Sequence, residues 1–301
     1  MHGWIILDNP AGITSTRAGV LIKRAMKVKS LGHAGTLDPF ATGILPLALG
    51  EATKVMPLIV SDIKEYEFEL TFGEQTDSND IDGEVVETTE VIPSAQSIQG
   101  ALHLFTGTIT QIPPVYSALK IGGERACDLM RRGEQVTMKP RQVTIHELEL
   151  LKMLSPTVAR LRVLCGTGTY VRALGRDIAH HLGSLAYLNQ LRRTRVGRFS
   201  LKNSVTLDTV LQDTSVLSSL PKEGQSKNIP WLLSIRDVLD DIPAFPVSDS
   251  DAIKIRQGQS IILDVVVKSE KVLLLYNTKE IALGEFIEGR FYPKKVFMHS
   301  L

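Results

Sequence analysis

The 301-residue sequence has little cysteine and no long apolar run. Its two cysteines, Cys127 and Cys165, lie far apart, which argues against a disulfide framework and predicts reduced thiols. No stretch of about 18 apolar residues occurs, so no membrane helix is expected. The first apolar run, WIIL, is too short for an export signal. We therefore expect a soluble, cytoplasmic protein.

Internal repeats, low-complexity tracts and clustered metal ligands are also missing. His180 and His181 are adjacent, which is the wrong spacing for two ligands on one helix face, and no cysteine or carboxylate cluster accompanies them. We predict no metal site. What remains is an ordinary globular composition, 43% hydrophobic and 22% charged, in a chain long enough for two domains.

Opposite charges are segregated along the chain, although the net charge is only +1. Residues 9–37 contain five basic residues and no acid, and residues 160–198 contain eight arginines and one acid. Residues 61–90 contain eleven acids and one lysine. If the basic segments share a face, the protein has a polyanion-binding surface. The alternative is that each segment is a solvated helix face or pairs with the acidic segment.

Hydrophobic periodicity predicts a mixture of helices and strands. Residues 66–72 alternate as a half-buried strand, and residues 16–26 and 170–183 have helical spacing. Residues 117–143 are basic and rich in turn residues, as in a mobile excursion. From residue 242 the pattern changes to a short helix and four short strands. We predict an α+β protein with two domains, residues 1–241 and 242–301.

One acid stands out in the segment GHAGTLDPFATG, residues 32–43. Asp38 lies there among small and apolar residues and directly precedes a proline. Asp before Pro is a common start for a short helical turn, so Asp38 could be only its N-cap, with Pro39 at the first position of the turn. Alternatively, the glycines let the backbone approach a ligand closely while the loop presents one carboxylate as nucleophile or base. These residues alone leave both interpretations open.

Five motifs in the same order along the chain resemble those of the bacterial tRNA pseudouridine synthase B (TruB) family. They are ILDNPAGITS, GHAGTLDPFATGILPLALGEATK, KEYEFELTFGEQTDSNDIDGE, PPVYSALKIGGERACDLMRRGE and CGTGTYVRALGRDIA. The resemblance implies a pseudouridine synthase fold, with a mixed, largely antiparallel central sheet flanked by helices. It also implies an RNA-gripping insertion at about 117–143 and a C-terminal RNA-binding domain that is similar to a PUA domain.

The resemblance also implies roles for individual residues. Asp38 matches the catalytic aspartate, Tyr66 the tyrosine that lies against the target base, and Arg172 the arginine that pairs with the aspartate. His33 matches the histidine that helps to hold the disrupted T loop. Further RNA-binding or active-site positions implied by the matched motifs are Lys54, Tyr170, Lys120, Arg131 and Arg132. Asn9, Cys127 and Met130 depart from the family pattern, but none of them is one of the three catalytic positions.

The activity implied is isomerisation of the T-loop uridine of tRNA to pseudouridine, with no cofactor and no metal. The enzyme would act as a monomer on tRNA, without an obligatory protein partner or membrane. Two alternatives remain. One is a non-catalytic tRNA folding chaperone of the same fold. The other is a nucleoside or glycoside hydrolase, but such enzymes usually need two cooperating carboxylates, and the loop around Asp38 offers one.

Overall fold

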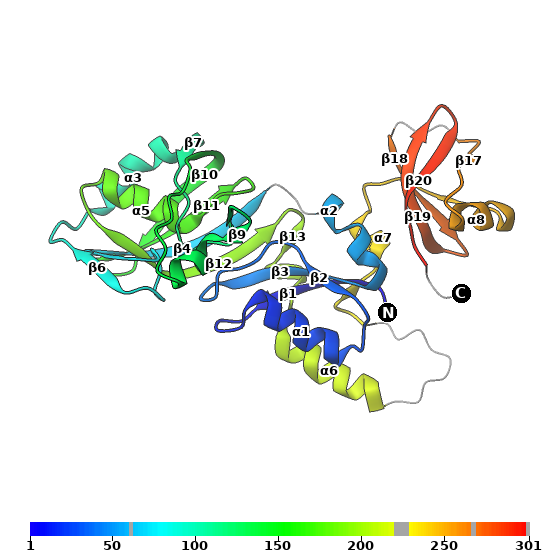
Figure 1. Cartoon of the computed structure of the whole chain (residues 1–301), viewed down its shortest axis with the longest axis horizontal. Coiled ribbons are helices and arrows are strands. Elements are labelled where there is room, and N and C mark those ends of the chain that lie inside the picture. Colours follow the sequence, from blue (N-terminus) through cyan, green and yellow to red (C-terminus); the bar gives the residue numbers. More distant parts are fainter. Residues whose placement is uncertain (60–62, 220–228, 266–268, 299–301) are drawn as a thin grey trace.

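The fold is built around two separate β-sheets, as Figure 1 shows. A computed structural model of the chain describes residues 1–59, 63–219, 229–265 and 269–298. The larger sheet is mixed and has eleven strands, and helices pack against it. The smaller sheet has five strands and lies in the C-terminal part of the chain. The predicted α+β class, with a small β-rich C-terminal domain, is confirmed.

The larger sheet is antiparallel except for two parallel pairs, β1 with β14 and β3 with β12. In spatial order its main strands are β14 (Val205–Thr206), β1 (Gly3–Asn9), β3 (Thr42–Leu49), β12 (Ala186–Val196), β4 (Lys64–Phe72), β11 (Val158–Cys165), β10 (Arg141–Met153) and β7 (Gly107–Gln111). Short strands pair at its sides, namely β2 (Leu31–His33), β13 (Phe199–Ser200) and β15 (Leu232–Leu233).

Strand β4 lies in the middle of this sheet, and its side chains alternate between the two faces, as predicted. Phe68, Leu70 and Phe72 are buried against the helices. Glu69, between Phe68 and Leu70, points to the other face and pairs with Arg160 across the β4–β11 ladder. A strand with one apolar side and one charged side can be central only if helices cover one side, which is what the structure has.

Helices α1 (Ser15–Ala25), α3 (Ala95–Ala101), α5 (Val171–His181) and α6 (Leu207–Ser219) cover the sheet (Figure 1). Buried residues of all four helices join the strands in one apolar core. The remaining elements of this part are β5 (Glu74–Thr76), β6 (Val85–Thr88), the 3-10 turns η1 (Gly50–Lys54), η2 (Leu102–Phe105) and η3 (Leu201–Asn203), and the short helices α2 (Met56–Ile59) and α7 (Ile235–Val238).

The basic segment 117–143 forms a small hairpin and a helix. These are β8 (Lys120–Ile121), β9 (Glu124–Arg125) and α4 (Ala126–Arg131). The backbone N–H groups of Ala126 and Cys127, at the start of α4, donate to the carbonyl oxygens of Leu119 and Ser117, just before the hairpin. The segment therefore has regular structure of its own, which its high content of turn residues did not predict.

The C-terminal sheet has the order β16 (Ala244–Pro246), β18 (Lys271–Tyr276), β19 (Lys279–Ile287), β20 (Arg290–Val296) and β17 (Ile261–Ile262), with α8 (Asp249–Arg256) beside it. Of the strand expected near residues 260–267, two residues pair as β17, and residues 266–268 lie outside the described part. The domain boundary at residue 242 stays a prediction. Among the described helices, none has the length and apolar character needed to cross a membrane.

Candidate active site

A cavity of about 670 Å³ opens beside the loop that contains Asp38. It is bounded by that loop, by the start of α1, by the β5–β6 turn and by the insertion. The charged residues that line it are Asp38, Asp77, Asp80, Asp82, Glu84, Arg125, Arg131 and Arg172. Carboxylates outnumber guanidinium groups, five to three, so the cavity itself is acidic.

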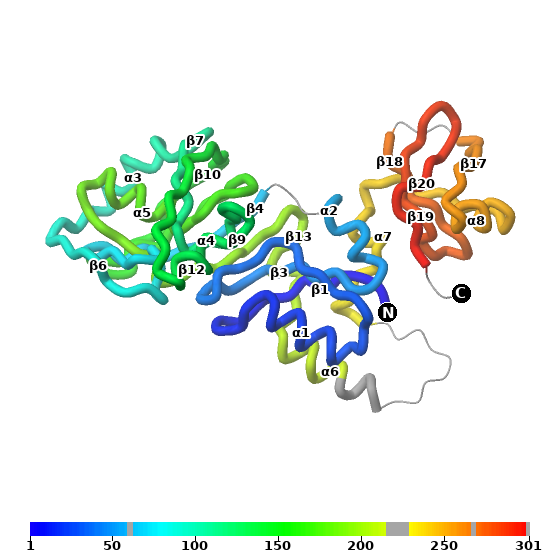
Figure 2. Tube along the Cα trace, viewed as in Figure 1, coloured from blue at the N-terminus to red at the C-terminus, as the bar shows by residue number. Residues whose placement is uncertain are grey.

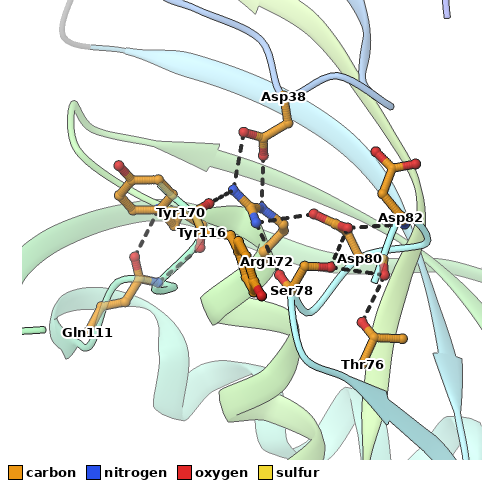
Figure 3. Close-up of polar contacts among 9 residues, drawn as sticks. All are labelled: Asp38, Thr76, Ser78, Asp80, Asp82, Gln111, Tyr116, Tyr170 and Arg172. Atoms are coloured by element: carbon orange, nitrogen blue, oxygen red, sulfur yellow. Dashed lines mark hydrogen bonds and ion pairs between the residues drawn. The ribbon is translucent and has the colours of Figure 1, made fainter. Parts of the chain in front are cut away.

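Asp38 lies in a turn rather than at the start of a helix. The backbone N–H of Ala41 donates to the Asp38 carbonyl at 3.0 Å, and β3 begins at the next residue, Thr42. The predicted short turn with Pro39 after Asp38 is therefore present, but Asp38 is not only a cap. Its carboxylate instead accepts two hydrogen bonds from Arg172, from Nε to Oδ2 at 2.9 Å and from Nη2 to Oδ1 at 3.2 Å (Figure 3). This is the bidentate geometry that orients a carboxylate most firmly.

Arg172 is buried, with 4% of its side chain exposed, at the second position of α5. Besides Asp38, its guanidinium donates to the carbonyl oxygens of Ser78 at 3.0 Å and Tyr116 at 2.9 Å. It also forms an ion pair with Asp80, at 3.1 Å from Nη1 to Oδ2. A side chain held by Tyr116, just before the insertion, by the β5–β6 turn and by the Asp38 loop has little freedom to move.

Asp80 is a member of this network that the motif comparison did not single out. It is 5% exposed, accepts a hydrogen bond from the Ser78 hydroxyl at 2.6 Å, and accepts another from the backbone N–H of Asp82 at 3.1 Å. Burial raises the pKa of Asp80, although Ser78 and Arg172 act in the opposite direction. The acidic residues of the segment TDSNDIDGE indicated that a further carboxylate could belong to the site. The sequence does not show which of them is buried.

Tyr66 and Arg193 are direct neighbours across the β4–β12 ladder. Burial raises the pKa of the Tyr66 hydroxyl, while the charge of Arg193 and a hydrogen bond from it lower that pKa. Asp38 lies close enough to raise it as well. Arg193 is 1% exposed and donates to the carbonyl oxygens of Ile44 at 2.7 Å and Gly35 at 2.8 Å. Arg193 therefore connects the tyrosine to the loop that contains Asp38.

His33 and Tyr170 flank the same region. His33 lies in β2, and its Nδ1 atom is buried with no hydrogen-bond partner in the described part of the chain. Burial, followed by the charge of Arg193, lowers the pKa of His33. Tyr170 directly precedes α5, and the side chain of Gln111 binds both its backbone N–H and its carbonyl (Figure 3). The Arg141 guanidinium lies 4.8 Å from the centre of the Tyr170 ring.

The other predicted RNA-binding residues lie further from Asp38. Arg131 lines the cavity, and Lys120 and Arg132 are exposed on the insertion. Lys54 does not join this group. Its Nζ donates to Glu51 at 2.7 Å and to the carbonyl of Val296 at 2.8 Å, where the two sheets meet. The structure therefore gives Lys54 a position between the domains.

The cavity also contains the thiol of Cys127, and both cysteines are free, as expected. Burial raises the pKa of Cys165 to about 11. Within the described residues, no three His, Cys, Asp or Glu side chains are grouped so as to hold a metal ion. The groups available for chemistry are the carboxylates that line the cavity, among them Asp38, the arginine that orients Asp38, and a nearby tyrosine.

Comparisons with known proteins agree on one family. Residues 23–171 match the sequence model of the TruB family pseudouridylate synthase N-terminal domain, and residues 172–239 match that of the tRNA pseudouridylate synthase B C-terminal domain. The tRNA pseudouridine synthase B of Bradyrhizobium diazoefficiens is 43% identical over 300 residues, which cover 99% of this chain and 86% of that protein. The corresponding protein of Caulobacter sp. is 41% identical and covers 99% of this chain and 96% of its own.

Two solved structures share the fold. One is of an H/ACA ribonucleoprotein bound to a substrate RNA containing 2′-deoxyuridine, with a TM-score of 0.69, 22% identity, and coverage of 99% of this chain and 85% of that chain. The other is of the archaeal box H/ACA Nop10–Cbf5 complex, with a TM-score of 0.68, 23% identity, and coverage of 98% and 86%. At this identity, the two structures support the fold assignment alone.

Proposed function

Because this chain belongs to the TruB family of pseudouridylate synthases and is a tRNA pseudouridine synthase, we propose that its target is the T-loop uridine at tRNA position 55. The family resemblance inferred from the five motifs is confirmed. The observation that best supports the proposed chemistry is the bidentate Asp38–Arg172 pair at the cavity wall. It places one oriented carboxylate where an extruded nucleotide can reach it.

The proposed reaction breaks the bond between uracil N1 and ribose C1′, turns the base, and joins C5 to C1′. N1 gains a proton and C5 loses one, so the product is an isomer of the substrate. Asp38 serves as nucleophile at C1′ or C6 or as base at C2′, and these three routes remain open. Arg172 supports each of them because it holds the carboxylate in one orientation.

The target base must leave its stack before Asp38 can reach it, which costs a few kcal/mol. We propose that Tyr66 stacks on the extruded uracil, a contact worth about 1–3 kcal/mol in single-strand recognition. We also propose that His33 and Tyr170 help to hold the opened loop, as the family resemblance implies. We further propose that the enzyme acts in the cytoplasm as a monomer, with tRNA as its substrate and no obligatory protein partner.

Tritium release tests the proposal. The purified protein is incubated with a tRNA transcript that carries tritium at uridine C5, and the experiment is repeated with Asp38→Asn. We expect the wild type to release tritium and to form pseudouridine at the T-loop position. We expect Asp38→Asn to bind the tRNA but to release none, because asparagine can act neither as the nucleophile nor as the base.

The same experiment distinguishes the alternatives. Tight tRNA binding without tritium release by the wild type would indicate a folding chaperone. Free uracil in the supernatant would indicate a hydrolase. The carboxylate held by Arg172 favours an enzyme over a chaperone, since binding RNA phosphates does not require an acid. Both Asp38 and Asp80 contact Arg172, so the number of carboxylates does not distinguish the isomerase from a hydrolase, and the free-uracil measurement decides between them.

A further inference from the structure

Residues outside the acidic cavity must supply positive charge for RNA binding. Five carboxylates line it against three arginines, and Arg172 is committed to Asp38 and Asp80. An uncharged uracil can enter such a cavity, but the phosphates on either side of it are repelled by the carboxylates. The cations that neutralise the RNA backbone must therefore lie on surfaces around the cavity.

The insertion is the obvious candidate, but much of its charge is already paired. Arg125 and Arg131 both bind Asp128, at 2.7 and 3.3 Å. Arg132 binds Glu124 at 2.7 Å and Glu134 at 2.8 Å. A guanidinium that leaves a carboxylate to bind a phosphate exchanges one anion for another, so it adds less to RNA affinity than a cation that has no carboxylate partner.

Helix α1 and the turn after it carry a different kind of charge. The basic residues there are Arg17, Lys23, Arg24, Lys27 and Lys29, and all five are exposed. Among the described residues, no carboxylate lies within ion-pair distance of any of them, and residues 9–37 contain no acid. The helix buries its other side, with Ala18 and Ile22, in the core. The cations thus lie on the exposed side of a packed helix, where the described residues place no carboxylate beside them.

The position of α1 connects this surface to the cavity. Thr14, Ser15 and Thr16, at the start of the helix, line the cavity next to Asp38. From there the helix runs alongside α6 for about 16 Å, at 1.5 Å per residue (Figure 2). A nucleic acid whose loop enters the cavity can therefore extend along the exposed side of α1.

Helix stability does not account for all of these charges. Lys23 and Arg24 lie in the last turn, where cations interact favourably with the helix dipole. Arg17 lies in the first turn, which contains no acid and where a cation is unfavourable. Its presence there is better explained by a polyanionic partner.

We propose that the exposed basic surface of α1, defined by Arg17, Lys23, Arg24, Lys27 and Lys29, is the main electrostatic docking site for the phosphate backbone of the RNA stem beyond the target loop. The proposal rests on the proposed function, since it takes the stem of the substrate tRNA as the partner. It ranks α1 above the insertion as the source of salt-dependent affinity.

Two matched triple variants test this ranking. One is Arg17→Gln with Lys23→Gln and Arg24→Gln, and the other is Arg125→Gln with Arg131→Gln and Arg132→Gln. The dissociation constant of full-length tRNA transcript is measured for each between low and moderate salt. Each phosphate contact contributes about 0.9 to the slope of log K against log salt, so we expect the α1 variant to lose on the order of 2 to 3 from the slope and to bind roughly 10- to 100-fold more weakly. We expect a smaller loss for the insertion variant.

A charge-preserving control separates electrostatics from folding. Arg17→Lys with Lys23→Arg and Arg24→Lys should keep the slope of the wild type, because each position retains a cation. An unchanged slope in the α1 glutamine variant, or an equal or larger loss in the insertion variant, would overturn the proposal. Failure of the proposed function gives a different result, namely wild-type protein that releases no tritium from C5-labelled tRNA whatever its salt dependence.

Discussion

At the scale of single residues, Arg193 connects Tyr66 to the loop that contains Asp38. It is buried, and among the described residues its guanidinium has carbonyl oxygens and the Tyr66 hydroxyl as partners rather than a carboxylate. An unneutralised buried cation is costly. Burial raises the pKa of Tyr66 and the charge of Arg193 opposes that shift, whereas burial and then the charge of Arg193 both lower the pKa of His33. Arg193 thus sets the electrostatics of the loop that contains Asp38 without touching its carboxylate.

The depressed pKa of His33 predicts a pH dependence of stability. The unfolded chain protonates this histidine below its ordinary pKa of 6.5, whereas the folded protein resists protonation until a lower pH. The unfolded state therefore binds more protons in that window, and the free energy of unfolding decreases as the pH falls through it. In His33→Asn we expect this decrease to become shallower, measured by urea denaturation at a series of pH values.

The exposed His146 provides the control. His146→Asn should leave the dependence of the unfolding free energy on pH as it is in the wild type. If His33→Asn and the wild type lose stability in parallel below pH 6.5, another group accounts for the acid sensitivity.

At the scale of elements, α5 places Arg172 through its packing on the sheet. Gly175 lies one turn after Arg172, and a Cβ atom at this position would lie 2.5 Å from Leu70 Cδ2 and 2.7 Å from Leu188 Cδ1. The helix can approach strands β4 and β12 this closely because glycine has no side chain. The depth of α5 therefore determines how far the Arg172 guanidinium reaches toward Asp38.

We expect Gly175→Ala to lower the free energy of unfolding by about 1–3 kcal/mol, as other overpacked cores do. We also expect it to lower the tritium-release rate, because movement of α5 away from Leu70 and Leu188 would displace Arg172. The matched control is Gly100→Ala in α3, where nothing lies within 4 Å of the new Cβ. There alanine should stabilise the helix by up to about 1 kcal/mol. Equal effects of the two substitutions on stability would refute this packing argument.

At the scale of the whole molecule, the two sheets share an apolar core. Trp4 and Ile44 of the larger sheet belong to the same buried cluster as Leu273, Leu283 and Phe297 of the C-terminal part. Lys54 and Glu51 add polar links there, since Glu51 accepts hydrogen bonds from Lys54 and from the backbone N–H of Met298. We infer that the C-terminal sheet has a fixed position beside the larger sheet.

Phe297→Ala should reveal this coupling. It removes a 1% exposed ring from the shared cluster, and we expect a loss of about 3–5 kcal/mol in the free energy of unfolding. The fluorescence of Trp4, which is buried in the same cluster, should change in the folded variant. Met298→Ala is the control because that side chain is 63% exposed. Loss of stability in Phe297→Ala without any change at Trp4 would mean that the C-terminal sheet unfolds independently.

Much of the fold and part of the site could be predicted before any coordinates were known. Alternation in residues 66–72 correctly predicted the strand that became β4, because periodicity reports directly which side of an element is buried. The motifs correctly suggested that Asp38 and Arg172 lie together. The glycine-rich loop itself left open whether Asp38 was only a cap. The two hydrogen bonds from Arg172 to its carboxylate show that it is not.

What the sequence by itself determined was the class of the fold, its main elements and the family to which the chain belongs. The tertiary structure decided which charges meet. In the folded chain Asp80 is buried beside Arg172, and Arg193 lies beside Tyr66. Lys54 lies at the junction of the two sheets, and arginines of the insertion pair with acids of the same segment. The physical reason is that burial patterns are local to an element, whereas charge pairing depends on which distant elements pack together.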